Sequence, residues 1–158
     1  MIKKPADTHK KTKNVTHPVR EVSARSAIYL EAVGRRKTAI ARVRFFASKA
    51  DGKNAPIIVN DRDFKIYFPL KKLQGVVLSP LEATATKDYH LTVKVSGGGP
   101  NAQAEAVRLG IARTLVSKEA ANRPRLKTLG YLMRDPRMVE RKKFGSRKAR
   151  RPQQWRKR

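Results

Sequence analysis

The chain has no cysteine among its 158 residues. This absence excludes a disulfide framework and a zinc site of the cysteine type, and it fits a reducing compartment. No apolar run approaches the roughly 18 residues that a membrane-spanning helix needs. The basic residues near the N-terminus are not followed by the apolar segment of a secretory signal, and Pro5, Asp7 and Pro18 argue against an organelle transit peptide.

Acidic residues are also scarce, since Asp and Glu number 12 against 38 Lys and Arg, and the net charge is +26. A compact protein with this charge repels itself unless a polyanion neutralises it. Nucleic acid is the favoured polyanion, because each cation that contacts a phosphate releases condensed counterions. An anionic membrane would require basic residues beside an apolar helical face, which the most basic stretches lack. We therefore expect a nucleic-acid partner, with no membrane and no small-molecule substrate.

The positive charge is concentrated towards the C-terminus. Residues 1–26 carry 7 basic and 2 acidic side chains, residues 27–120 carry 16 and 8, and residues 121–158 carry 15 and 2. Large apolar side chains are rare at both ends, so neither end can bury itself. The sequence therefore predicts a flexible basic arm over residues 1–26, one globular core over residues 27–131 and an extended RNA-binding tail over residues 132–158.

Between these ends, several short stretches alternate apolar and polar residues, which is the pattern of half-buried strands. The alternation predicts strands over residues 28–32, 39–45 and 90–96, and the short apolar run over residues 57–59, closed by Asn60, predicts a fourth. The first two strands are expected to pair as a hairpin whose turn contains residues 34–37. Residues 48–54 are polar and indicate a loop.

Helical spacing is clearest after Pro100, where Ala104, Val107, Ile111 and Leu115 recur on one face. Proline suits the first turn of a helix, so this helix is expected to begin at Pro100. A second helix is predicted over residues 125–132, directly after a proline.

The pattern between residues 61 and 87 is weaker. Asp61 is expected to cap a short helix that runs into Tyr67 and Phe68 and stops at Pro69. The remainder of this segment is ambiguous, with helix predicted in part near residues 81–85.

The run Gly97-Gly98-Gly99 before Pro100 ends the last strand. It is interpreted as a tight strand-to-helix turn that could also bring backbone amides onto a phosphate. It lacks the Lys-Ser or Lys-Thr of a nucleotide-binding loop, so an ATP site is not expected.

Groups for catalysis are few. His9, His17 and His90 are far apart in the sequence, and no cysteine accompanies them. Asp61 and Asp63 are interpreted as helix caps rather than metal ligands. We expect no enzymatic activity, no cofactor and no metal.

The candidate binding residues are mostly arginines and lysines of the hairpin and the tail. Arginine grips phosphate with two parallel hydrogen bonds and stacks on bases. Phe144 and Trp155 lie among the tail cations and are predicted to pack on bases or in an RNA groove. The alternatives are a solvated tail and an ordinary exposed hairpin turn. The predicted RNA-binding cations are Arg35, Arg36, Lys37, Arg42, Arg44, Arg134, Arg137, Arg141, Lys142, Lys143, Arg147, Lys148, Arg150 and Arg151.

Three stretches in this order resemble one protein family. They are AVGRRKTAIARV at residues 32–43, GGG followed by QAEAVRLGIAR at residues 97–113, and RDPR with ERKKFG at residues 134–145. Together they resemble small-subunit ribosomal protein nine of the bacterial type, over about residues 28–158.

The resemblance implies an α+β fold like the second domain of ribosomal protein five, which is a small β-sheet with helices on one side in a β-α-β arrangement, plus a long extended basic C-terminal tail. It implies binding to 16S-type ribosomal RNA in the head of the small subunit, the 3′ major domain, beside neighbouring head proteins. It further implies that the terminal Lys157 and Arg158 contact the anticodon stem-loop backbone of peptidyl-site transfer RNA. The expected location is the cytoplasmic ribosome, and the sequence leaves bacterial and organellar origin open.

Two features depart from the family pattern. The family commonly ends in Pro-Gln-Phe-Ser-Lys-Arg, whereas Trp155 and Arg156 stand here at the Phe and Ser positions. The arm before Ala27 has no counterpart in shorter members. The alternative function is a free basic protein that binds or compacts nucleic acid, which would not co-sediment with small subunits.

Overall fold

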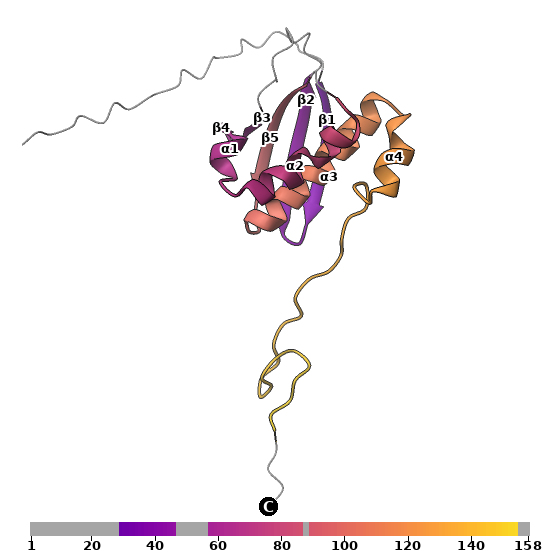
Figure 1. Ribbon diagram of the computed structural model, residues 1–158. Coiled ribbons are helices and arrows are strands. Elements are labelled where there is room, and N and C mark those ends of the chain that lie inside the picture. Colours follow the sequence, from indigo (N-terminus) through magenta and orange to yellow (C-terminus); the bar gives the residue numbers. More distant parts are fainter. Residues whose placement is uncertain (1–28, 47–56, 87–88, 155–158) are drawn as a thin grey trace, which may run out of the picture.

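The computed structural model describes residues 29–46, 57–86 and 89–154, and Figure 1 shows their arrangement. The predictions for the arm over residues 1–26, for the loop over residues 48–54 and for Ile28 lie outside the described residues. So do those for Trp155, Lys157 and Arg158.

One five-stranded mixed sheet forms the centre of the fold. Strands β1 (Tyr29–Arg36) and β2 (Ala39–Phe46) form an antiparallel hairpin, and β5 (His90–Ser96) pairs antiparallel with the other edge of β2. Strand β3 (Ile57–Val59) is parallel to β5, and β4 (Arg62–Asp63) pairs with β3. The order is β1-β2-β5-β3-β4, in which β1, β2, β3 and β5 are the four predicted strands.

Helices cover one face of this sheet. Helices α1 (Phe64–Tyr67) and α2 (Lys71–Ala83) connect the parallel strands β3 and β5 in a β-α-β arrangement. Helix α3 (Pro100–Lys118) packs on β1 and β2 and against α2, and α4 (Asn122–Thr128) follows it. The predicted α+β architecture with helices on one side is therefore confirmed, as Figure 1 shows.

The first strand is longer than predicted. Because β1 continues to Arg36, the prediction that the hairpin turn begins at Gly34 is wrong. The turn consists of Lys37 and Thr38, and Lys37 adopts a positive φ of 51°. Gly34 instead lies buried within β1, directly against the backbone of α3 at Ala106 and Gly110.

Small residues let α3 lie close to the sheet. A Cβ added to Gly34 would overlap the carbonyl oxygen of Ala106, and one added to Gly110 would lie 2.5 Å from Cγ2 of Val43. Such separations are well below van der Waals contact, so neither position has room for a methyl group. The Gly34–Gly110 contact thus sets the distance between the hairpin and α3.

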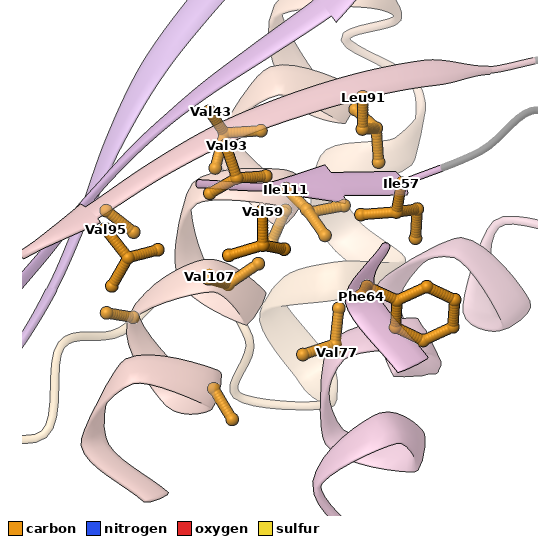
Figure 2. Packing of buried hydrophobic residues seen from close by; sticks show 14 of the residues in the cluster. Val43, Ile57, Val59, Phe64, Val77, Leu91, Val93, Val95, Val107 and Ile111 are labelled. Atoms are coloured by element: carbon orange, nitrogen blue, oxygen red, sulfur yellow. The ribbon is translucent and has the colours of Figure 1, made fainter. Parts of the chain in front are cut away.

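The core fills the space between the helices and the sheet, as Figure 2 shows. Val43, Val59 and Val93 from the strands lie opposite Val107 and Ile111 of α3, and all five are essentially fully buried. The helical face predicted from spacing is confirmed, because Ala104, Val107, Ile111 and Leu115 have no exposed surface.

Helix α2 occupies the segment with the ambiguous pattern. The helix predicted in part near residues 81–85 is present up to Ala83, but it begins much earlier, at Lys71. Leu73, Val77 and Leu81 are buried at four-residue spacing. In the sequence, Pro80 argues against a helix here, because proline removes the hydrogen bond to the carbonyl four residues earlier. Here the hydroxyl of Ser79 donates to that carbonyl, on Val76, at 2.9 Å, so the helix continues through Pro80.

Two predicted helices also differ in their boundaries. The cap of α1 is Asp63 rather than Asp61, since Oδ1 of Asp63 accepts from the backbone N–H of Lys65 at 3.0 Å. Asp61 lies in the turn between β3 and β4 with a φ of 62°. Helix α4 begins before Pro124 and not after it, because a proline in the first turn needs no N–H partner. The helix also ends at Thr128, before the predicted end at Leu132, and Gly130 with a φ of 72° follows it.

The tail begins where packing on the core stops. Tyr131 and Leu132 still contact the core cluster. From Arg134 to Gln154 the chain forms no helix or strand, apart from an isolated bridge between Lys148 and Arg151. Figure 1 shows this segment running away from the core, as predicted for an extended tail.

We predict opposite effects of alanine at two glycines. Gly34→Ala should lower the free energy of unfolding by about 1–3 kcal/mol or more, because the new methyl group overlaps α3. Gly75→Ala should raise it by roughly 0.5–1 kcal/mol, because Gly75 lies inside α2 and nothing is within 4 Å of its missing Cβ. Urea unfolding of the full-length variants measures both values. A Gly34→Ala protein as stable as the unmodified one would show that α3 and β1 do not lie this close.

Candidate nucleic-acid interface

The predicted cations lie in two places, on the β1–β2 hairpin and along the tail. Arg36, at the end of β1, joins these two parts. Its side chain is only 12% exposed, which is unusual for a residue beside a hairpin turn. All three guanidinium nitrogens contact protein oxygens.

The partners of Arg36 come from α3 and from the tail. Nε donates to the carboxylate of Glu105, and Nη2 lies 3.1 Å from Oδ2 of Asp135. Nη1 donates to the backbone carbonyls of Asp135 at 3.3 Å and of Arg137 at 2.6 Å. One arginine therefore ties the hairpin, α3 and the first residues of the tail together, and we call this set of contacts the tail root.

Asp135 has a second cationic partner within the tail. The backbone N–H of Arg137 donates to Oδ1 at 2.9 Å, and Nε of Arg137 lies 3.1 Å from both carboxylate oxygens. Hydrogen bonds from the Arg137 side chain and backbone, together with the charge of Arg36, hold the pKa of Asp135 below its ordinary value. The carboxylate is therefore ionised at neutral pH and remains a partner for both arginines.

Further cations surround the tail root. A small surface hollow is lined by Arg35, Arg108 and Arg134, beside Tyr131 and Met133. The guanidinium of Arg108 lies over the ring of Tyr131, 5.3 Å from its centroid, which is close enough for a cation–π contact. The tail thus leaves the core through a positively charged surface.

The described tail presents most of its cations to solvent. Its two acidic residues are already engaged, Asp135 with Arg36 and Arg137, and Glu140 with Arg150 at 2.8 Å. The other tail cations are exposed, and none has an acidic partner among residues 29–46, 57–86 and 89–154. They are Arg134, Arg141, Lys142, Lys143, Arg147, Lys148 and Arg151.

Part of the tail folds back on itself. The ion pair between Glu140 and Arg150 joins residues ten positions apart, and the backbone N–H of Arg147 donates to the carbonyl of Arg151 at 2.8 Å. Between these contacts Phe144 is fully exposed. The loop in the yellow part of Figure 1 corresponds to this segment, which we call the tail loop, residues 140–151. It presents an aromatic ring surrounded by cations.

The hairpin cations Arg35, Arg42 and Arg44 lie on the sheet face that α2 and α3 leave open. Nε of Arg42 and Nε of Arg44 each lie 3.0 Å from a different oxygen of Glu31. Arg35 is exposed, and so is Lys37 in the turn. The guanidinium of Arg44 also lies over the ring of Tyr29, 5.1 Å from its centroid.

Sequence reasoning missed the carboxylates that organise these cations. Glu105 and Asp135 stand out in the sequence only as members of the family motifs. No local pattern connects them with Arg36, because Glu105 is 69 positions away. The prediction of site residues also left out Tyr29, Phe46 and His90, although strand alternation places them on the sheet face that α2 and α3 leave uncovered.

Two kinds of feature are absent from the part of the chain that the structure describes. Residues 29–46, 57–86 and 89–154 hold no group of three or more His, Cys, Asp or Glu side chains that could bind a metal ion. Within the same ranges no helix combines the length and the apolar character needed to cross a membrane.

We predict that Arg36 controls the stability of the tail root. Arg36→Gln should increase the rate at which trypsin cuts after Arg134 and Arg137 by about tenfold or more, because each lost charge-assisted hydrogen bond contributes ~1.5–3 kcal/mol. Arg42→Gln is the matched control, since it removes an exposed pair with Glu31 that does not touch the tail. Equal cleavage rates for the two variants would show that the Arg36 contacts do not hold the tail.

Comparison with known families agrees with this architecture. The family model described as "Ribosomal protein S9/S16" matches residues 34–158, which is well over half of the chain and includes the end of β1, β2, α3 and the tail. The family to which the sequence motifs pointed is thereby confirmed. The chain belongs to the ribosomal protein S9/S16 family and is a structural, RNA-binding protein of the small ribosomal subunit.

Proposed function

We propose that this protein binds 16S-type ribosomal RNA in the head of the small subunit, in the 3′ major domain and beside other head proteins. We further propose that its tail extends to the peptidyl site of a cytoplasmic ribosome. The observation that supports this best is a tail held at one end by Arg36 and carrying seven exposed cations without acidic partners among the described residues.

The charge of the tail favours folded RNA as its environment. Each cation placed on a phosphate releases condensed counterions, so the affinity gained grows with the number of contacts. The exposed apolar residues Met138, Val139 and Phe144 also need a partner that excludes water from them. A groove between RNA helices offers phosphates for the cations and base faces for these side chains.

The length of the tail fits a second, distant contact. A segment from Arg134 to Arg158 spans at most roughly 80–90 Å when fully extended. The tail loop shortens this reach in the described part of the chain. The tail root defines where and in which direction the tail starts. The end of the tail can therefore reach one particular place on the small ribosomal subunit. We propose that this place is the anticodon stem-loop of peptidyl-site transfer RNA.

The alternative is a free basic protein that compacts nucleic acid. Family membership favours the ribosome. Sucrose-gradient sedimentation in moderate salt tests the choice, because a ribosomal protein stays with the small subunit, whereas a free nucleic-acid-binding protein is washed off.

We predict that the tail supplies much of the electrostatic affinity for ribosomal RNA. Removing residues 133–158 should weaken binding to a transcript of the 3′ major domain and flatten the slope of log affinity against log salt concentration, by ~0.7–0.9 for each phosphate that the protein no longer touches. As a control, Lys71→Gln with Lys72→Gln removes exposed charge from α2 and should leave the slope nearly unchanged. A slope that survives the truncation would mean that the tail remains in solvent.

We predict a different effect for the last two residues. Deleting Lys157 and Arg158 should leave subunit assembly normal, because the remaining tail cations bind RNA collectively. It should weaken transfer-RNA binding in the peptidyl site, since each charge-assisted hydrogen bond that is removed contributes up to ~1.5–3 kcal/mol, and less where salt screens it. The effect should be similar for different transfer RNAs, because phosphate contacts carry no base information.

Filter binding of transfer RNA to purified subunits, with and without these two residues, measures the effect. Equal affinities and off-rates at several salt concentrations would refute the contact. Subunits that fail to form would refute the proposal that the last two residues act in transfer-RNA binding and are not needed for assembly.

A further inference from the structure

The face of the sheet opposite α2 and α3 carries an ordered array of side chains that the tail does not account for. In antiparallel strands, directly paired residues point to the same side. Tyr29, Phe46 and His90 are paired in this way across β1, β2 and β5 and form one aromatic rung. We call the surface that begins at this rung the open face.

The next rungs of the open face are largely polar or basic. Glu31 and Arg44 are paired beside the aromatic rung, and Arg42 and Lys94 are paired one step further along. Successive rungs on one face are two residues apart, or roughly 7 Å. This spacing is close to the distance between neighbouring phosphates of a single RNA strand, so cations on successive rungs can follow a nucleic-acid backbone.

The aromatic rings are arranged so that they do not stack on one another. The ring centroids of Tyr29 and Phe46 are 5.6 Å apart and tilted by 47°, and those of Phe46 and His90 are 5.4 Å apart and nearly perpendicular. Tyr29 is 44% exposed. Ring faces that are not stacked on each other remain able to receive flat partners.

The charge of the open face favours nucleic acid over a protein as its partner. On β1, β2 and β5 its cations are Arg35, Arg42, Arg44 and Lys94, against one acid on the same strands, Glu31. Because Glu31 pairs with both Arg42 and Arg44, it holds these two guanidinium groups in position. The centre of a protein interface is usually poor in charged residues, whereas surfaces that bind single-stranded nucleic acid combine stacking aromatics with cations.

We propose that the open face is a second RNA-binding surface, on which unpaired bases stack on Tyr29 and Phe46 while Arg42, Arg44 and Lys94 contact the adjoining phosphates. The inference rests on the proposed function, because it assumes that the RNA is that of the small subunit. It adds a contact on the core that is independent of the tail. Sheets with aromatic rungs serve as base-stacking platforms in other RNA-binding domains, so the geometry suits this role.

Two further features fit base stacking. Burial lowers the pKa of His90, so its ring is neutral at neutral pH and the rung carries no charge of its own. The guanidinium of Arg44 lies over the ring of Tyr29, 5.1 Å from its centroid, so a flat group fits on this ring.

The first test compares four full-length variants in binding to the 3′ major domain transcript. Tyr29→Ala should weaken binding by about fivefold or more without changing the salt slope, because a base stack releases no counterions. Tyr29→Phe should bind like the unmodified protein, because it keeps the ring. Arg42→Gln with Lys94→Gln should weaken binding and also flatten the slope, whereas Lys71→Gln with Lys72→Gln on α2 should do neither.

The second test is ultraviolet cross-linking of assembled small subunits followed by mass spectrometry of the peptides. A nucleotide attached to the peptide of Tyr29 or Phe46 supports the proposal. Tail peptides that carry nucleotides while the open face carries none, or is cross-linked only to another protein, overturn it and leave the proposed function standing. Absence of nucleotides from both regions would count against the proposed function as well.

Discussion

The contacts of Arg36 connect the parts of this protein that act together. Its guanidinium binds Glu105 of α3 and Asp135 and Arg137 of the tail from the end of β1. An exposed pair of this kind contributes little, but the side chain of Arg36 is largely buried and forms several charge-assisted hydrogen bonds at once. The tail is consequently an extension of the core with a defined starting direction, and a long segment that cannot fold alone begins at a fixed place.

The position of Arg36 depends in turn on the close packing of α3 on the hairpin. Gly34 lies against Ala106 and Gly110, and any side chain at Gly34 would push the helix away from β1. Glu105 is next to Ala106 on α3, as Arg36 is two residues from Gly34 on β1. The small residues therefore set the backbone separation at which the arginine and the carboxylate can meet.

The few acidic residues near the interface have structural uses. Glu31 holds Arg42 and Arg44, Glu140 closes the tail loop with Arg150, and Asp135 engages two arginines. Each carboxylate orients cations rather than cancelling the positive charge as a whole. The other cations of the described tail are exposed, so the electrostatic repulsion within the free protein becomes attraction once RNA is bound.

The sequence by itself determined the features that depend on neighbouring residues. Alternation predicted β2 and β5, helical spacing predicted α3 through Val107 and Ile111, and the charge distribution predicted the extended tail. Helix α2 was underestimated, because the hydrogen bond by which Ser79 compensates for Pro80 leaves no mark in a hydrophobic pattern. Only the tertiary structure decided that Gly34 lies inside a strand, that Arg36 holds the tail, and that Tyr29, Phe46 and His90 share one rung. These outcomes depend on contacts between residues up to about one hundred positions apart, such as Arg36 with Arg137, and no local periodicity encodes which distant partners will meet.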